Sequence, residues 1–122
     1  MIPLVKPSLW LRDRPHLARF EKALRDPAGA QARVLERLLG TNRETAFGRD
    51  HGFDTIRSAA DYARRVPLRD YEAVRPYVDR VAAGEDGVLT AEPTVMFTTT
   101  SGTTNLPKLI PVTASWRAEM SS

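Results

Sequence analysis

The densest group of side chains suited to chemistry lies over residues 98–108, which read TTTSGTTNLPK. A glycine lets the backbone approach a ligand closely. Hydroxyl side chains and successive backbone N–H groups together form a concavity that binds anions. The lysine at the end of the segment adds a positive charge that can reach a phosphate. These residue types, in this order, predict a phosphate-binding loop.

Two interpretations of this segment stay open on composition alone. Serine, threonine and glycine are also ordinary turn residues, and a threonine-rich hairpin loop with one lysine is common. The spacing differs from the G-x-x-x-x-G-K-[ST] pattern of one large class of nucleotide-binding loops, so that class is not indicated. The choice between a binding loop and a plain turn therefore depends on the surrounding elements.

Two strands are predicted to hold the segment. Residues 94–99 are rich in β-branched and aromatic side chains, which favours a strand. Residues 109–112 form a second such run, in which Pro111 indicates an edge strand or a strand end. Thr113 is expected to cap a helix that contains Trp116. Two strands and one short helix cannot cover both faces of a sheet, so we expect the sheet to be incomplete within this chain.

Short helices are predicted before the strands. Apolar residues recur with helical spacing over 17–24, and Asp26 is expected to cap a second helix that Gly40 closes. A capping box, in which the first and fourth side chains bond to free backbone N–H groups, is predicted at 41–44. We expect Gly48 to end the short helix that follows.

Two more helices are predicted before the first strand. A second capping box at 58–61 opens a helix that Pro67 ends, and Asp70 caps a helix that kinks or restarts at Pro76 and ends at Gly84. The aromatic side chains of the helical region are predicted to be core residues rather than ligand contacts. They are Phe20, Tyr62, Tyr71 and Tyr77.

Composition excludes several kinds of site. The chain has 122 residues, of which 42% are hydrophobic and 27% charged, as in an ordinary globular domain. It contains no cysteine, which excludes disulfides, thiolate metal sites and cysteine nucleophiles. Its two histidines, His16 and His51, are far apart in the sequence and are expected on the surface or in turns. We therefore expect no metal site built on this chain's own residues.

The charge pattern bears on partners and location. The formal net charge is +3, but positive and negative residues are interleaved, which is typical of solvated helix faces rather than a nucleic-acid-binding stripe. No apolar run is long enough to span a membrane, and the start of the chain does not resemble a signal peptide. We expect a cytoplasmic protein with no nucleic-acid or membrane partner.

Residues 100–108 (TSGTTNLPK) resemble the T-S-G-[ST]-T-G-x-P-K motif of the adenylate-forming enzymes. This superfamily includes acyl-CoA synthetases, luciferases, peptide-synthetase adenylation domains and the GH3 acyl-acid amido synthetases. The one departure is Asn105, where the motif has glycine. Asparagine is the non-glycine residue that best tolerates a backbone with positive φ, so the loop is expected to keep its shape.

The flanking segments resemble the GH3 family in particular. They are residues 45–53 (TAFGRDHGF), 66–72 (VPLRDYE) and 108–113 (KLIPVT). With the loop, the resemblance spans about residues 35–113. It implies an α/β fold in which the chain is the N-terminal part of a larger adenylating domain. Residues 1–86 would be mainly helical, and residues 87–122 would form the first strands, the phosphate loop and a helix of an incomplete sheet.

The resemblance also implies an activity. The family uses ATP and Mg²⁺ to convert a carboxylic acid to an acyl-adenylate, and its GH3 members then transfer the acyl group to an amino acid. Six residues are implied to hold the ATP phosphates, and no catalytic residue is assigned. They are Thr100, Ser101, Gly102, Thr103, Thr104 and Lys108. The chain by itself is expected to be inactive. Two alternative functions stay open: the chain could be a fragment of an acyl- or aryl-CoA ligase, or it could be a non-enzymatic helical interaction module.

Overall fold

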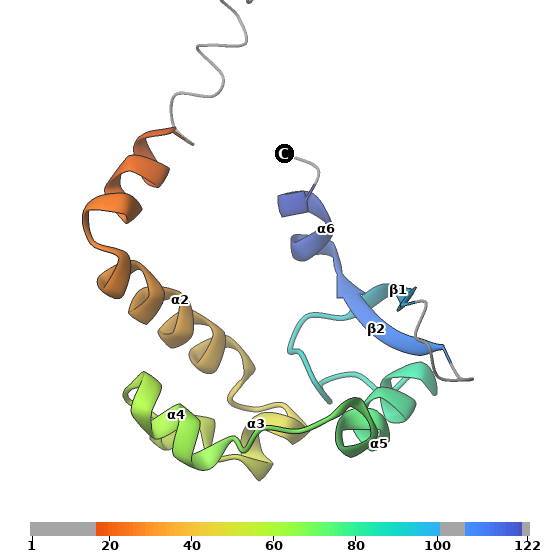
Figure 1. Cartoon of the computed structure of the whole chain (residues 1–122). Helices are drawn as coiled ribbons and strands as arrows, with labels where there is room; N and C mark the ends of the chain where they lie inside the picture. Colours follow the sequence, from red (N-terminus) through yellow and green to blue (C-terminus); the bar gives the residue numbers. More distant parts are fainter. Residues whose placement is uncertain (1–16, 101–106, 121–122) are drawn as a thin grey trace, which may run out of the picture. The chain divides into compact units, whose positions relative to one another are not determined.

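The structure is a computed structural model that describes residues 17–100 and 107–120 (Figure 1). The chain forms two compact units that divide between Leu35 and Glu36. In the first unit, residues 17–25 are helical, as predicted.

Asp26 caps the next helix, α2 (Pro27–Asn42), which begins in the first unit and ends in the second. The Gly29 N–H group donates to the Asp26 carboxylate at 2.9 Å. The prediction for Asp26 is thus confirmed. Phe20 is 62% exposed, so its predicted place in a core is wrong.

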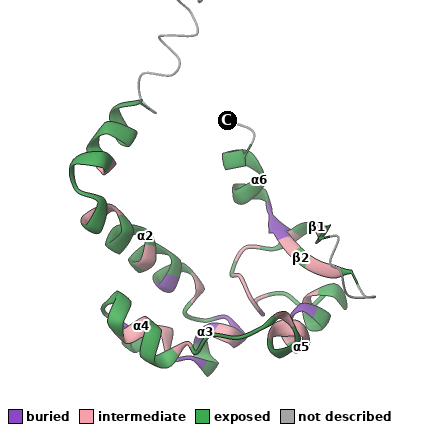
Figure 2. Cartoon of the chain, in the orientation of Figure 1, coloured by how far each residue is buried: buried purple, intermediate pink, exposed green. Residues whose placement is uncertain are grey.

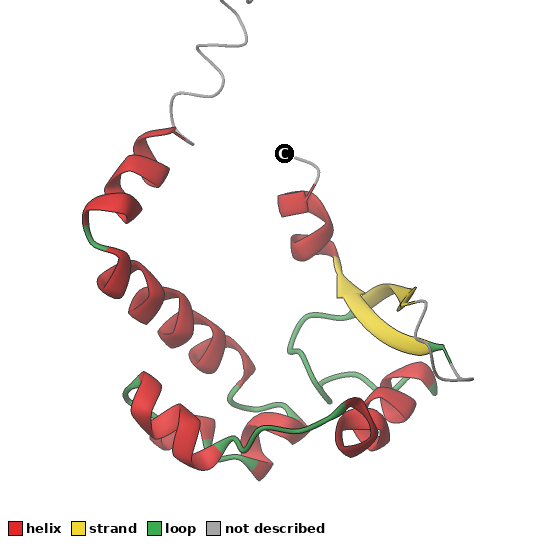
Figure 3. Ribbon diagram, viewed as in Figure 1, coloured by secondary structure: helices red, strands yellow, loops and turns green. Residues whose placement is uncertain are grey.

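The second unit combines short helices with one hairpin (Figure 3). After the end of α2 its elements are α3 (Ala46–Asp50), η1 (Phe53–Thr55), α4 (Ala59–Arg65), α5 (Tyr71–Ala82), β1 (Thr94–Thr100), β2 (Lys108–Thr113) and α6 (Ala114–Met120).

The boundary between α2 and α3 differs from the prediction. A Cβ at Gly40 would meet no atom within 4 Å, and α2 runs through this glycine instead of ending there. The capping box predicted at 41–44 is also wrong, because α2 continues to Asn42 and Thr45 is the cap of α3. The Thr45 hydroxyl accepts from the Gly48 N–H group at 2.9 Å and donates to the Asn42 carbonyl at 2.7 Å.

Gly48 lies inside α3 rather than at its end. A Cβ at this position would lie 2.1 Å from the Asn42 backbone oxygen. The glycine is therefore required by the close approach of two backbone segments, and the helix ends later, at Asp50.

The other predicted helix starts are confirmed. The Asp61 N–H group donates to the Ser58 hydroxyl at 3.1 Å at the start of α4. The Ala73 N–H group donates to the Asp70 carboxylate at 3.0 Å at the start of α5. At Pro76 a kink or a restart was predicted. The helix does not restart, because α5 is one helix through this residue, and the kink stays a prediction.

The end of α5 is a Schellman motif at Gly84, which has a φ of 91°. The Gly84 N–H group donates to the Val81 carbonyl and the Glu85 N–H group to the Arg80 carbonyl, both at 3.0 Å. The Arg80 guanidinium also pairs with the Glu85 carboxylate through two contacts. The prediction that Gly84 ends this helix is therefore confirmed.

Aromatic rings hold α3 against its neighbours in the second unit. The Phe47 ring stacks on His51 at 4.0 Å between centroids and meets Tyr77 edge-on at 5.2 Å. His51 lies in the turn that ends α3, one of the two positions expected for it, but it is buried, and one of its ring nitrogens bonds to the Phe47 carbonyl.

The segment before β1 is tied to the start of α3. The Ala46 and Phe47 N–H groups donate to the Gly87 and Val88 carbonyls at 2.9 and 3.0 Å. Val88 is 1% exposed and is among the most buried side chains of the described residues. Figure 2 shows the buried residues in purple, scattered among exposed and intermediate ones. The contact with α3 fixes the chain shortly before it enters the hairpin.

The two predicted strands pair as an antiparallel hairpin. Phe97 lies opposite Pro111, and Thr99 lies opposite Leu109. The Leu109 N–H group donates to a side chain of α5, so it points away from β1. The nitrogen of Pro111, two residues on, faces the same outer side, where its missing N–H group removes no bond to β1. A proline is therefore tolerated in β2 because its nitrogen lies on the outer edge of the hairpin, which agrees with the edge strand predicted from Pro111.

Candidate phosphate-binding site

The hairpin brings together the two ends of the predicted phosphate-binding segment. Thr100 is the last residue of β1, Lys108 is the first residue of β2, and the two are direct partners in the register. The four residues predicted between them to contact phosphates lie outside the described residues, as does Asn105. They are Ser101, Gly102, Thr103 and Thr104. Their roles stay predictions.

The hairpin connection is longer than chain reversal requires. Residues 101–107 join the strands, whereas two to five residues suffice for most hairpins. The connection is therefore longer than a tight hairpin turn, and it is the sequence motif, not the length, that supports a binding loop.

The Lys108 ammonium group lies over the ring of Tyr71, the first residue of α5, at 5.7 Å from the ring centroid. This is within the range of a cation–π interaction. Within residues 17–100 and 107–120, Lys108 makes no salt bridge. Its positive charge is therefore not neutralised by a carboxylate of the described chain.

Tyr71 also holds the backbone of β2. Its hydroxyl oxygen accepts from the Leu109 N–H group at 2.8 Å, and its O–H group donates to the Leu109 carbonyl at 3.2 Å. These bonds replace the contacts that a third strand would make to Leu109. The residue was predicted to be a core aromatic, and it is half-buried. Periodicity alone cannot reveal this contact, because the two residues are 38 positions apart.

Glu72 and Arg75 lie beside the same ring. Two hydrogen bonds of 2.8 and 2.7 Å join the Arg75 guanidinium to the Glu72 carboxylate. These bonds, and to a smaller extent the charge of Lys108, hold the pKa of Glu72 below its ordinary value. The Arg75 guanidinium lies 5.1 Å from the Tyr71 ring centroid. Glu72 is thus ionised at neutral pH and bonded to Arg75, which leaves Lys108 available for a ligand.

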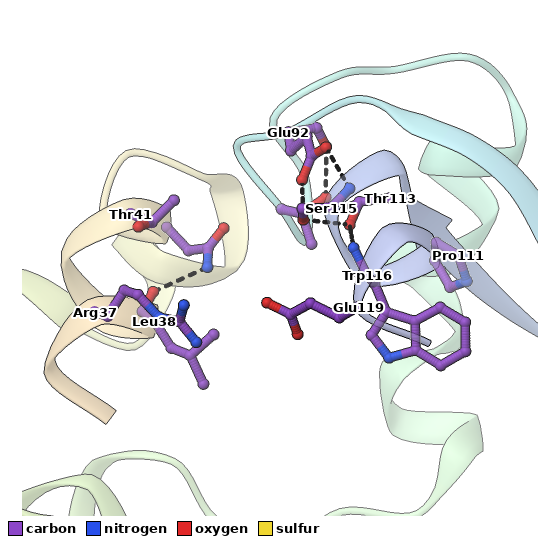
Figure 4. Close-up of a pocket in the computed structure, with 11 residues that line it drawn as sticks. Arg37, Leu38, Thr41, Glu92, Pro111, Thr113, Ser115, Trp116 and Glu119 are labelled. Atoms are coloured by element: carbon purple, nitrogen blue, oxygen red, sulfur yellow. Dashed lines mark hydrogen bonds between the residues drawn. The ribbon is translucent and has the colours of Figure 1, made fainter. Parts of the chain in front are cut away.

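A hollow of about 370 Å³ lies between the end of α2 and α6. Figure 4 shows Arg37 and Leu38 on one side of it and Trp116 and Glu119 on the other. None of the described residues of the predicted phosphate site lines it. It therefore contributes nothing to that site.

The start of α6 beside this hollow is held by Glu92. This carboxylate accepts from the Ser115 N–H group at 2.9 Å and from the Ser115 hydroxyl at 2.5 Å. These bonds lower the pKa of Glu92. Thr113 also caps α6, as predicted, through a 3.4 Å bond from the Trp116 N–H group.

The described part of the chain contains no group of three or more side chains that could hold the expected Mg²⁺ by itself. Magnesium is usually held by one or two carboxylates together with substrate phosphates. Within the described ranges, no three histidine, aspartate or glutamate side chains converge on one point. The described residues alone therefore do not form a complete metal site, and no step below depends on Mg²⁺. A separate finding concerns membranes: no helix in the described part of the chain is both long enough and apolar enough to cross one.

Comparison with known proteins identifies the relatives of this hairpin and its supporting helices. The family model described as the GH3 family N-terminal domain matches residues 16–122. The chain belongs to the GH3 family. This confirms the resemblance of the loop and its flanking segments, and the helices with their two-stranded sheet agree with the α/β class expected from it.

Named GH3 relatives share about a third of the matched residues. Jasmonoyl–L-amino acid synthetase GH3.3 of Oryza sativa subsp. japonica is 36% identical over 89 residues, which cover 72% of this chain and 19% of that protein. Indole-3-acetic acid-amido synthetase GH3.15 of Arabidopsis thaliana is 33% identical over 115 residues, or 93% of this chain and 19% of that protein.

A solved structure shares the fold. The structure titled AtGH3.15 acyl acid amido synthetase in complex with 2,4-DB matches with a TM-score of 0.75 and 30% identity, over 99% of this chain and 21% of that one. The GH3 chain thus spans about a fifth of the length of the relatives it matches.

Proposed function

We propose that this chain supplies the ATP-phosphate-binding hairpin of a ligase that activates a carboxylic acid and joins it to an amino acid. One observation carries the proposal. In a GH3 chain, the hairpin register sets Thr100 directly opposite Lys108 at the mouth of a loop rich in hydroxyl groups. The Lys108 ammonium group forms no ion pair with the rest of the described chain.

In the proposed reaction, a carboxylate oxygen of the acid attacks the α-phosphorus of ATP. The bond from this phosphorus to the bridging oxygen breaks, and pyrophosphate leaves with the electron pair. The amine of an amino acid then attacks the acyl carbon of the acyl-adenylate, AMP leaves, and the amine loses a proton. Fixed donors that oppose the charge on the departing pyrophosphate accelerate the first step.

Each proposed residue has a role in that first step. The hydroxyl groups of Ser101, Thr103 and Thr104, with the backbone at Gly102, would donate to phosphate oxygens. Thr100 would set the exit of the chain from β1. Lys108 would oppose the negative charge as it moves onto pyrophosphate.

The test uses a full-length GH3 protein that carries this chain as its N-terminal part, called the full-length enzyme below. Acid-dependent exchange of labelled pyrophosphate into ATP is measured over a panel of carboxylic acids. Amino acids and coenzyme A are then compared as acceptors of the acyl group. We expect exchange with at least one acid and an amide product. Exchange followed by transfer to coenzyme A alone would assign an acyl-CoA ligase, and no exchange with any acid would contradict the proposal.

A further inference from the structure

We propose that Tyr71 positions the Lys108 ammonium group for the ATP phosphates. The inference rests on the proposed function and adds a residue to it from outside the loop. Tyr71 acts in two ways: its hydroxyl group fixes the strand that begins with Lys108, and its ring supports the lysine charge.

The hydroxyl group of Tyr71 is well placed to fix the backbone of Lys108. It bonds to both backbone groups of Leu109, at 2.8 and 3.2 Å, directly after the lysine. Tyr71 is itself fixed, because it is the first residue of α5 and Asp70 caps that helix. The start of β2 is therefore tied both to its partner strand, where Lys108 faces Thr100, and to a capped helix.

The ring of Tyr71 is well placed to direct the charge of Lys108. A cation over a tyrosine face is attracted more weakly than one in a buried ion pair, so it can turn to an incoming phosphate at low cost. Glu72 is the acidic group beside Lys108, and its carboxylate is engaged by two bonds from Arg75. The Tyr71 ring therefore restricts the position of the Lys108 ammonium group, while no carboxylate of the described residues neutralises its charge.

A purely structural role for Tyr71 would have a different consequence. If the residue only joined α5 to β2, its loss would lower stability and would affect ATP binding whether or not Lys108 were present. If it positions Lys108, its effect on ATP binding depends on the lysine. A double-mutant cycle separates the two roles.

Tyr77 provides a matched control on the same helix. Its hydroxyl group donates to the Asp50 carboxylate at 2.7 Å, away from the hairpin, and like Tyr71 it is half-buried. Tyr71→Phe and Tyr77→Phe each remove one hydroxyl group and keep the ring. A difference between them in ATP binding cannot come from the chemistry of the substitution.

The experiment measures MgATP affinity by calorimetry, together with pyrophosphate exchange and thermal unfolding, in the full-length enzyme. Tyr71→Phe should weaken MgATP binding roughly five- to tenfold, the scale of lost hydrogen bonds at one site. On the Lys108→Ala background the same change should weaken it no further. Tyr77→Phe should leave the affinity unchanged even where it lowers the unfolding temperature.

The possible failures are distinguishable. If Lys108→Ala leaves both MgATP affinity and exchange unchanged, the proposed function of the loop is wrong and this inference falls with it. If Lys108→Ala weakens both but Tyr71→Phe does not, only the inference is overturned. The inference is also overturned if Tyr71→Phe weakens MgATP binding as much on the Lys108→Ala background as in the unsubstituted enzyme. It is likewise overturned if Tyr77→Phe weakens MgATP binding as much as Tyr71→Phe does.

Discussion

Gly40 and Gly48 have opposite steric surroundings, which leads to a paired prediction at the residue scale. A Cβ at Gly40, inside α2, would meet nothing within 4 Å, whereas one at Gly48 would lie 2.1 Å from the Asn42 backbone oxygen. Gly40→Ala should raise the free energy of unfolding by about 0.5–1 kcal/mol, because alanine loses less backbone entropy in a helix. Gly48→Ala should lower it by about 1–3 kcal/mol, the usual cost of overpacking.

Urea unfolding of the two variants and the parent chain checks both signs. The pair is its own control, since each variant adds the same methyl group. Equal shifts for the two variants would mean that the close approach of α3 to the end of α2 is not present in solution.

The residue-scale prediction for activity concerns Lys108. In the full-length enzyme, Lys108→Ala should slow acid-dependent pyrophosphate exchange about ten- to a hundredfold, as expected from the loss of a charge-assisted hydrogen bond worth about 1.5–3 kcal/mol. The unfolding temperature should change little, because the side chain forms no salt bridge with residues 17–100 or 107–120. Lys22→Ala, at an exposed helical position, is the control. Unchanged exchange would make Lys108 an ordinary surface lysine.

At the scale of elements, the start of α6 should depend on pH through Glu92. The hydrogen bonds from Ser115 keep the folded pKa of Glu92 below its ordinary value of 4.5. The unfolded state therefore takes up the proton more readily. This stabilisation is complete above the ordinary pKa and is lost as the pH falls through the folded one.

Glu92→Gln should therefore reduce the loss of stability between neutral pH and the acid range below 4.5. The glutamine amide keeps the shape of the side chain but carries no titrating charge. Unfolding by urea at a series of pH values measures the change, with Glu36→Gln on the exposed side of α2 as the control. A pH profile identical to that of the parent chain would mean that Glu92 does not stabilise α6. The Glu92→Gln variant should still lose some stability as the pH falls, because hydrogen-bonded ion pairs with arginine also lower the pKa values of Glu72 and Glu85.

Local signals in the sequence were enough to predict most elements. The caps at Asp26, Ser58 and Asp70, and the two strands, follow from side chains that act on their own backbone or on near neighbours. The errors at Gly40 and Gly48 have one cause. A glycine that ends a helix and a glycine that admits a neighbouring backbone look alike in a sequence, and only tertiary packing separates them.

The part of the candidate site that depends on local sequence was predicted, and the part that depends on tertiary contacts was not. The loop motif identified Thr100 and Lys108, and their pairing follows once two strands flank a polar segment. The role of Tyr71 could not be predicted, because its contact with Leu109 joins distant parts of the chain. Its place in a segment that resembles the GH3 family was the one available signal.

At the scale of the whole molecule, the chain spans about a fifth of the length of its relatives. We expect the 122-residue polypeptide alone to catalyse no acid-dependent pyrophosphate release, because binding one set of phosphates does not position an acid and an acceptor. The purified chain is assayed beside a heat-treated sample. Release clearly above that of the heated sample would contradict the prediction.

The same 122-residue polypeptide should also be only marginally stable. Among the described residues, the buried hydrophobic side chains are few and none is aromatic: Leu39, Ala46, Ile56, Val78, Val88 and Val112. Large apolar residues of the hairpin remain exposed, with Val95 at 49%, Met96 at 43% and Ile110 at 44%. A two-stranded sheet is at best marginally stable in water. We therefore expect a free energy of unfolding below the roughly 5–15 kcal/mol of typical domains.

Amide hydrogen exchange followed by NMR tests this for each element of the chain. Exchange should be fast in β1, where the strand has one partner, and slower at the Phe47 amide, which bonds to the Val88 carbonyl beside buried side chains. Thermal unfolding should be broad, because the hairpin and the helical core can open separately. A single sharp, reversible transition with strong protection over residues 95–97 would show that the hairpin and the helices form one cooperative unit without any further chain.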